Sequence, residues 1–300
     1  MRLGYACINL TLSKQKDKVT TNRGMVKNTF LKRGLEYAGE LSLLNVKDLY
    51  KILKWNVKHG ITFFRVSSDI FPWSSNYNLY DLPQFKEIKD VLSVIGKYVK
   101  KHKIRLTSHP GPYNVLVSPK KSVVDNTITD LNMHAQLFNL LDLEKSPFNK
   151  INIHCNGVYG DKKKAMDRFC SNFRNLSLDI RSRLTIENDD KPSMYSVKDL
   201  MYIHEKIGIP IVFDYHHHHF CTGGLSEKEA LQLSISTWPK NITPVVHYSE
   251  SKSKNENDSA IKPQAHSDYI NNLPDTYGYN VDVMIEAKAK ELSLKSFMNF

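Results

Sequence analysis

The sequence lacks the features of a membrane protein and those of a secreted one. No uninterrupted apolar run approaches the roughly 20 residues that cross a bilayer, and the opening residues MRLGYACINL contain no apolar signal-peptide core. The four cysteines (Cys7, Cys155, Cys170, Cys221) show no paired spacing such as C-x-x-C, which argues against a disulfide framework and a cysteine-based zinc site. We therefore expect a soluble, intracellular protein with reduced thiols.

A glycine-rich phosphate loop is also missing after the first predicted strand, which argues against an open dinucleotide-binding sheet. The hydrophobic fraction of 41% is nonetheless enough for a real core. Lys and Arg number 42 against 31 Asp and Glu, which gives a formal net charge of +11. This excess attracts a polyanion such as nucleic acid, although a lysine-rich surface without such a partner has the same composition.

Strand-like and helix-like segments alternate along the chain, and the strand-like runs are apolar and β-branched, as in a parallel sheet buried on both faces. The predicted strands are 2–7, 61–67, 103–108, 150–155, 183–188, 209–214, 243–248 and 281–287. The predicted helices are 40–59, 84–102, 122–143, 161–178, 196–207, 226–237 and 287–296, with surface loops at 11–33 and 249–265. Eight such units in 300 residues predict an α/β fold, a single (β/α)8 TIM barrel over residues 1–300.

Isolated His, Asp and Glu residues follow the ends of six successive predicted strands. They are His109, His154, Glu187, Asp214, His217, His247 and Glu286. The C-terminal ends of barrel strands meet at one rim, where catalytic groups concentrate. Imidazoles and carboxylates together are the ligands that a cluster of divalent cations requires. Such a cluster activates water and stabilises a leaving oxygen, which is the usual solution for phosphodiester hydrolysis.

The remaining histidines have simpler interpretations. A lone His after a strand is more often a hydrogen-bonded rim residue than a ligand, so the metal site is predicted from the whole series. In the run His216 to His219 we expect one ligand and at least one residue that packs or faces solvent. His59, His102 and His204 lie near predicted helix ends, where they complement the helix dipole.

Ten sequence blocks resemble, in order, those of the UV damage endonuclease (UvdE) family, which is distantly related to endonuclease IV. The blocks are RLGYACINLTL near the start, TTNR (20–23), FRVSSDIFPW (64–73), SHPGPY (108–113), HCNGVYGDK (154–162), IENDD (186–190), VFDYHHH (212–218), VHYSES (246–251), AHSDYI (265–270) and VMIEAKAKE (283–291). The resemblance implies a TIM barrel that nicks DNA immediately 5′ to a lesion. The implied substrates are pyrimidine dimers, 6-4 photoproducts and abasic sites in damaged double-stranded DNA.

The resemblance also implies three divalent metal ions, with Mn²⁺ favoured and Zn²⁺ or Mg²⁺ as alternatives. The implied ligand sets are His109, His154 and Glu187 for the first ion, Glu187, Asp214, His247 and Glu286 for the second, and His217 and His266 for the third. Glu187, His109 and Glu286 are the predicted catalytic residues. We expect a monomer that uses no nucleotide cofactor such as ATP and no membrane, in the cytoplasm or wherever the DNA resides.

The resemblance further implies a set of residues that contact the lesion. Tyr5, Asn9 and Tyr113 match family positions that fill the gap when damaged bases leave the stack, although ordinary packing is the alternative for the tyrosines. The family motif H-P-G-Q-Y reads HPGPY here, and Pro112 offers no side-chain hydrogen bond, so we expect a shifted lesion preference. Val245 stands where some members have a lysine, reported as carboxylated.

Other functions remain open at this point. An abasic-site endonuclease like endonuclease IV has a similar ligand set. A sugar isomerase or epimerase on a related barrel also gathers His and carboxylates around divalent ions, but its substrate needs no basic surface and no rim tyrosines. A catalytically silent DNA-damage binder would have no need of the complete ligand set.

Overall fold

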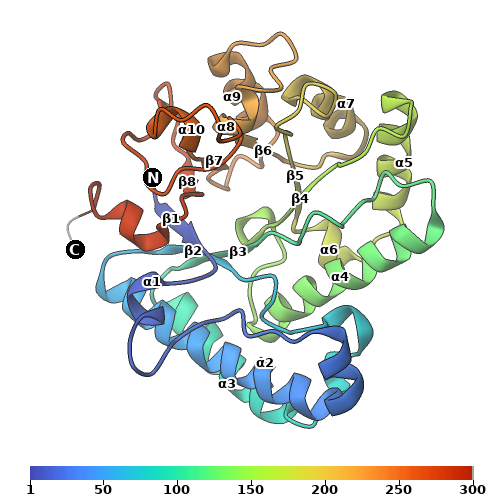
Figure 1. Cartoon of the computed structure of the whole chain (residues 1–300). Coiled ribbons are helices and arrows are strands. Elements are labelled where there is room, and N and C mark those ends of the chain that lie inside the picture. Colours follow the sequence, from blue (N-terminus) through green and yellow to red (C-terminus); the bar gives the residue numbers. More distant parts are fainter. Residues whose placement is uncertain (299–300) are drawn as a thin grey trace.

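A closed barrel of eight parallel strands forms the centre of the computed structural model, which describes residues 1–298 (Figure 1). Each strand pairs with the next along the chain, and the last pairs with the first. The strands are β1 Leu3–Ala6, β2 Phe63–Val66, β3 Arg105–Ser108, β4 Ile151–His154, β5 Leu184–Glu187, β6 Ile211–Asp214, β7 Val245–Tyr248 and β8 Asp282–Ile285. The predicted (β/α)8 barrel is therefore confirmed.

Helices surround the barrel and connect its strands (Figure 1). The longer ones are α2 Lys27–Lys58, α3 Phe85–Lys101, α4 Lys121–Leu140, α5 Lys162–Arg174, α7 Val197–Ile207 and α9 Glu227–Ser236. The short elements are α1 Leu10–Ser13, α6 Leu178–Arg181, α8 Tyr215–His218, α10 Lys252–Asn255 and the 3₁₀ turns η1 Ser74–Asn76, η2 Leu79–Asp81, η3 Pro147–Asn149 and η4 Lys290–Leu294. Within residues 1–298, none of the helices is both long enough and apolar enough to span a membrane.

Three predicted segments differ from the structure, one of them the predicted loop 249–265, which contains α10. Residues 11–33 are not all loop, because α1 lies within them and α2 already begins at Lys27. Gly34 interrupts the helical geometry with φ 59° and ψ −151°, so the periodic pattern after it does not extend back to the first turns. Phe30 on these turns stacks on Trp73 at 5.8 Å between ring centroids, a tertiary contact that stabilises them. The predicted last helix is the 3₁₀ turn η4.

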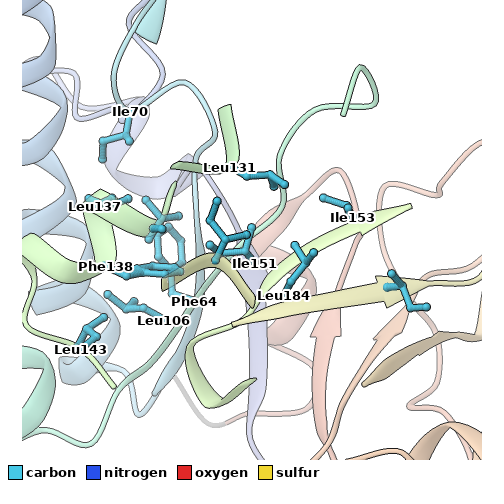
Figure 2. Close-up of a cluster of buried hydrophobic side chains, with 14 of the residues drawn as sticks. Phe64, Ile70, Leu106, Leu131, Leu137, Phe138, Leu143, Ile151, Ile153 and Leu184 are labelled. Atoms are coloured by element: carbon cyan, nitrogen blue, oxygen red, sulfur yellow. The ribbon is translucent and has the colours of Figure 1, made fainter. Parts of the chain in front are cut away.

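The core lies mainly between the barrel wall and the helices. Leu106, Ile151 and Leu184 of β3, β4 and β5 point toward α4, where Leu137 and Phe138 are buried with them (Figure 2). Because side chains alternate along a strand, the neighbouring residues point into the barrel. A second cluster includes Ala6, Phe63, Val212, Val245 and Met284, from five different strands.

A buried ion pair closes the lower end of the barrel, where the strands begin. Arg105 is fully buried, and its Nη1 lies 2.9 Å from Oδ2 of Asp282. The guanidinium also donates to the carbonyl oxygens of Phe148 and Thr243 at 2.9 and 2.7 Å. Arg2 reaches the same carboxylate at 2.9 Å. Burial lowers the pKa of Arg105 to about 10, and Asp282 favours its charged form.

Removing this carboxylate is expected to destabilise the barrel strongly. Asp282→Ala leaves the charge of Arg105 buried without its partner, so the free energy of unfolding should fall by about 3–5 kcal/mol. Urea denaturation followed by circular dichroism measures the change. Asp125→Ala is the control, because Asp125 pairs with Lys121 on the exposed face of α4, and its loss should cost less than about 1 kcal/mol. Equal losses in the two variants would contradict the role given to the pair.

Candidate metal centre at the barrel rim

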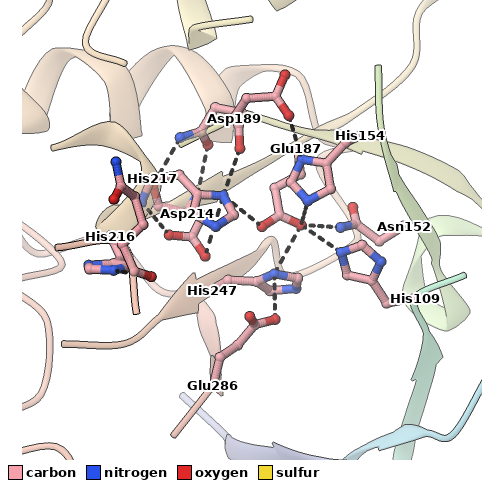
Figure 3. Close-up of polar contacts among 12 residues, drawn as sticks. His109, Asn152, His154, Glu187, Asp189, Asp214, His216, His217, His247 and Glu286 are labelled. Atoms are coloured by element: carbon pink, nitrogen blue, oxygen red, sulfur yellow. Dashed lines mark hydrogen bonds and ion pairs between the residues drawn. The ribbon is translucent and has the colours of Figure 1, made fainter. Parts of the chain in front are cut away.

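The predicted series of His, Asp and Glu residues converges at the C-terminal ends of the strands, as Figure 3 shows. His154 and Glu187 end neighbouring strands and are register partners, and Asp214 is likewise opposite His247. His109 and Glu286 directly follow β3 and β8. The closed barrel therefore brings side chains from six strands to one rim.

Glu187 is the hub of this centre, and its carboxylate is 1% exposed. Its Oε2 lies 3.2 Å from Nε2 of His109, 3.8 Å from Nε2 of His154 and 3.1 Å from Nδ1 of His247. Asn152 donates a hydrogen bond to the same oxygen. Although burial alone would raise the pKa of this carboxyl group, the surrounding imidazoles hold it well below its usual range.

Asp214 and His217 form the second part of the centre. Oδ1 of Asp214 accepts a hydrogen bond from the backbone N–H of His217 at 2.8 Å, which fixes the turn after β6. Burial raises the pKa of Asp214 to about 7. Burial also opposes the charged form of His217, but the carboxylates of Asp214, Glu187 and Glu286 outweigh it and raise the pKa of His217 to about 9.

Glu286 completes the centre from the other side of His247. Its Oε1 lies 3.2 Å from Nδ1 of His247, and Arg65 of β2 forms an ion pair with the same oxygen. Burial opposes ionisation of Glu286, but Arg65 is the largest influence that keeps its pKa well below the usual range. The carboxylate is therefore ionised and held at a fixed position.

Several ring and carboxylate atoms of the centre are buried and, although the two ring nitrogens lie near carboxylates, have no hydrogen bond of good geometry within residues 1–298, which is unusual for polar groups. These are Nδ1 of His154, Oδ2 of Asp214 and Nδ1 of His247. Donor atoms that all lie within 4.8 Å of one another form three groups, namely His109, His154 and Glu187; Glu187, Asp214 and His217; and Asp214, His247 and Glu286. Mixed imidazole and carboxylate groups of this kind suit divalent cations, so the residues fit the metal ions that were predicted.

His266 differs from the other predicted ligands. Among residues 1–298, none of these donor groups includes it. Its Nδ1 lies 3.0 Å from the backbone carbonyl oxygen of Glu286, and its ring centroid is 6.3 Å from that of His217. His217 instead groups with Glu187 and Asp214. The two-histidine site for a third ion stays a prediction.

The structure adds residues to which the sequence analysis assigned no role. Asp189 lies with Oδ1 3.0 Å from Nδ1 of His154. The Asn188 side chain binds the backbone of Asp214, with 2.8 Å to its N–H and 3.0 Å to its carbonyl oxygen. Lys150, fully buried, lies 3.1 Å from Nε2 of His247. The only sequence signal for such residues is polar character within or beside an apolar strand.

The run of four histidines divides between the centre and its surroundings, while the expected ligand stays a prediction. Only His217 joins a donor group among the described residues. His216 and His218 are buried, the first with Nε2 3.2 Å from the carbonyl oxygen of Gln264. His219 is exposed.

The residues predicted to contact the lesion fall into two classes. Tyr5 and Asn9 are fully buried; Tyr5 donates to Oδ1 of Asn56 at 2.6 Å, and Asn9 donates to the Tyr5 hydroxyl at 2.9 Å. Tyr113 is 88% exposed on the loop after β3, and Pro112 beside it is exposed as well. Of these four residues, Tyr113 and Pro112 are therefore the two that are accessible to a large substrate in the free protein.

Comparisons with known proteins agree with the resemblance found in the sequence. The family model of UV-endonuclease UvdE matches residues 1–299. A UV-damage endonuclease of Schizosaccharomyces pombe is 38% identical over 299 residues, which is 97% of this chain and 49% of that protein. A UV DNA damage endonuclease of Clostridium perfringens is 35% identical over 306 residues, or 100% of this chain and 70% of that protein. The chain thus spans about half the length of the first relative.

Solved structures give a consistent result. The crystal structure of SacUVDE matches with a TM-score of 0.85 and 34% identity, and the match covers 99% of both chains. A D-tagatose 3-epimerase-like protein matches with a TM-score of 0.59 at 12% identity, covering 99% of this chain and 94% of that one. The second likeness concerns the barrel fold alone.

Protons are expected to compete with metal ions at this centre. Asp214 and His217 hold protons up to about pH 7 and pH 9 respectively, and each must lose its proton before it can bind a cation. The affinity for Mn²⁺ should therefore rise between pH 6 and pH 9, by roughly tenfold per pH unit for each proton released. Isothermal titration calorimetry in buffers of different ionisation enthalpy measures the Mn²⁺ affinity and the number of protons released on binding. An affinity independent of pH over this range would contradict the prediction.

Proposed function

The chain belongs to the UV-endonuclease UvdE family, and from this membership we propose that it is a DNA repair endonuclease that cuts the backbone of UV-damaged DNA. The observation that carries the proposal is the buried carboxylate of Glu187, surrounded by His109, His154 and His247 at the rim of the barrel. Relatives that are named UV-damage endonucleases support the same activity.

The proposed substrate is double-stranded DNA that contains pyrimidine dimers, 6-4 photoproducts or abasic sites, nicked 5′ to the lesion. The net charge of +11 supports binding to the phosphate backbone. Tyr113, at 88% exposure on the rim, is suited to stack on bases that the lesion unstacks. Pro112 beside it supplies no side-chain hydrogen bond, so base-specific contacts at this point would differ from those of a glutamine. We propose a monomer that acts without a nucleotide cofactor.

The proposed centre holds divalent ions, with Mn²⁺ favoured, through the three donor groups at the rim and a further position at His266. When bound, such ions polarise the phosphodiester and lower the pKa of water. The protein's own residues fix the geometry: Asn152 orients Glu187, and Arg65 orients Glu286. Asn188 orients Asp214 through both backbone groups. These contacts leave the ligand atoms preorganised at the rim.

Mutation of Glu187 or His109 is expected to abolish nicking. Glu187→Gln keeps the size of the side chain but removes the charge that three imidazoles surround, and His109→Ala removes one of those imidazoles. Each change should lower the nicking rate by at least about 100-fold, since ligand contacts of this kind set metal affinity. The assay is conversion of supercoiled, UV-irradiated plasmid to the nicked form in Mn²⁺. His219→Ala, on an exposed residue of the same histidine run, should keep the full rate. Near-normal nicking by Glu187→Gln would overturn the site assignment.

Defined substrates test the proposed reaction itself. Duplexes that carry one pyrimidine dimer, one abasic site or no lesion are incubated with the protein in Mn²⁺ and after chelation with EDTA. We expect a single incision 5′ to the dimer, no incision of the undamaged duplex, and no product after chelation. Binding should also weaken as salt rises, because phosphate contacts release counterions. Equal cutting of damaged and undamaged duplexes would contradict a repair function, whereas binding that is insensitive to salt would favour a small-molecule substrate.

A further inference from the structure

Lys150 is a buried amine that the proposed chemistry does not use. It lies directly before β4, its side chain is fully buried, and it is among the largest side chains in the protein with no exposure. Within residues 1–298 it forms no ion pair, and its amine has one hydrogen-bond contact. Burying an unpaired amine is costly, so such a residue normally has a function that compensates for the cost.

Two other basic side chains, Arg105 and Arg183, are also fully buried, and Arg105 shows the contrast. Arg105 has its own carboxylate, Asp282, at 2.9 Å and several backbone carbonyl oxygens around it. The guanidinium of Arg105 therefore has its partners within the protein, and the contact with Asp282 is a structural ion pair. Lys150 has no such partner, and its amine points instead to the underside of the metal centre.

The one partner of Lys150 is an imidazole nitrogen of the centre. Its Nζ lies 3.1 Å from Nε2 of His247, whose ring is also fully buried. The other ring nitrogen, Nδ1, faces Glu187 Oε2 at 3.1 Å and Glu286 Oε1 at 3.2 Å. That Nδ1 is within ion-pair distance of both carboxylates but makes no hydrogen bond of good geometry to either, as suits an atom that binds a cation. An imidazole can turn by half a revolution about its bond to Cβ, which would point carbon atoms at the carboxylates.

Alternate residues along β4 all serve the same centre. His154 is a donor in the first group, and Asn152, two residues earlier, donates to Glu187. Lys150, two residues earlier again and in an extended backbone with φ −65° and ψ 146°, lies on the same inward face. The inward face of β4 therefore carries a candidate ligand, a residue that contacts Glu187 and a residue that contacts His247.

We infer that Lys150 is a positioning residue for His247: its neutral amine accepts the Nε2–H of the ring from below, so that the unprotonated Nδ1 faces Glu187 and Glu286. This inference rests on the proposed metal centre, because Nδ1 is presented to a bound ion. Contacts to the outer nitrogen of a ligating histidine orient the ring, and their loss commonly lowers metal affinity by about 10–100-fold.

Lys150→Met separates this role from simple packing. Methionine has a similar length and no charge, so it fills the space and removes the contact with Nε2. Isothermal titration with Mn²⁺ should show one ion bound about 10–100-fold more weakly than in the unaltered chain. The melting temperature of the EDTA-treated variant should equal or exceed that of the unaltered chain, since an unpaired buried amine has been replaced by an apolar side chain.

Ile151→Ala is the matched control. Ile151 is fully buried next to Lys150 on β4, but its side chain lies on the opposite face of the strand and packs in the core beneath the helices. Its truncation should lower the melting temperature through lost packing and leave the affinity for Mn²⁺ unchanged. If Lys150→Met does not fold, Lys150→Leu carries the same test with a smaller apolar side chain.

The outcomes distinguish this inference from the proposed function. Equal Mn²⁺ affinity in Lys150→Met and the unaltered chain would overturn the positioning role while leaving the centre in place. An unaltered chain that binds no Mn²⁺ would overturn the metal centre and the role of Lys150 together. Loss of nicking on damaged DNA with metal binding intact would count against the proposed substrate alone.

Discussion

The centre of this protein depends on an ionised carboxylate that is almost completely removed from water. Glu187 is 1% exposed, and a bare carboxylate in that environment would be strongly disfavoured. It is stabilised because imidazoles approach it from β3, β4 and β7, and because Asn152 donates to it. Every strand that contributes such a group must therefore reach the rim at the same height, so the register of the barrel and the ionisation of one side chain are linked.

The two faces of each barrel strand have different roles. On each strand, one face packs against the helices, as Ile151 does, and the other carries polar groups toward the rim or fills the interior. The polar groups themselves form two shells: residues that can bind ions, and residues such as Arg65, Asn188 and Lys150 that hold them in place. The residues that contact the candidate ligands fix the positions and orientations of the ligand atoms.

Sequence reasoning located the barrel and most of the rim because both have local signals. Apolar runs predicted the eight strands, and a His, Asp or Glu at the ends of six of them predicted the donors that the structure brings together. The early turns of α2 were missed because they depend on stacking of Phe30 against Trp73, residues far apart in the chain. Burial of Tyr5 and Asn9, and the contact of Lys150 with His247, likewise arise only when distant strands close into a ring. The sequence contained those residues but no local pattern that distinguished their roles.

The buried pair of Arg105 and Asp282 lies at the lower end of the barrel, whereas the donor groups lie at the upper rim. The buried ion pair at the lower end is thus separate from the donor groups at the rim. Changes at the rim can alter the reaction while the lower layer preserves the scaffold, which is a physical route by which one architecture diverges into different enzymes. The D-tagatose 3-epimerase-like protein, at 12% identity, shares the barrel fold alone. For protein engineering, a rim stripped of its ligands would offer an empty, already folded platform for new chemistry.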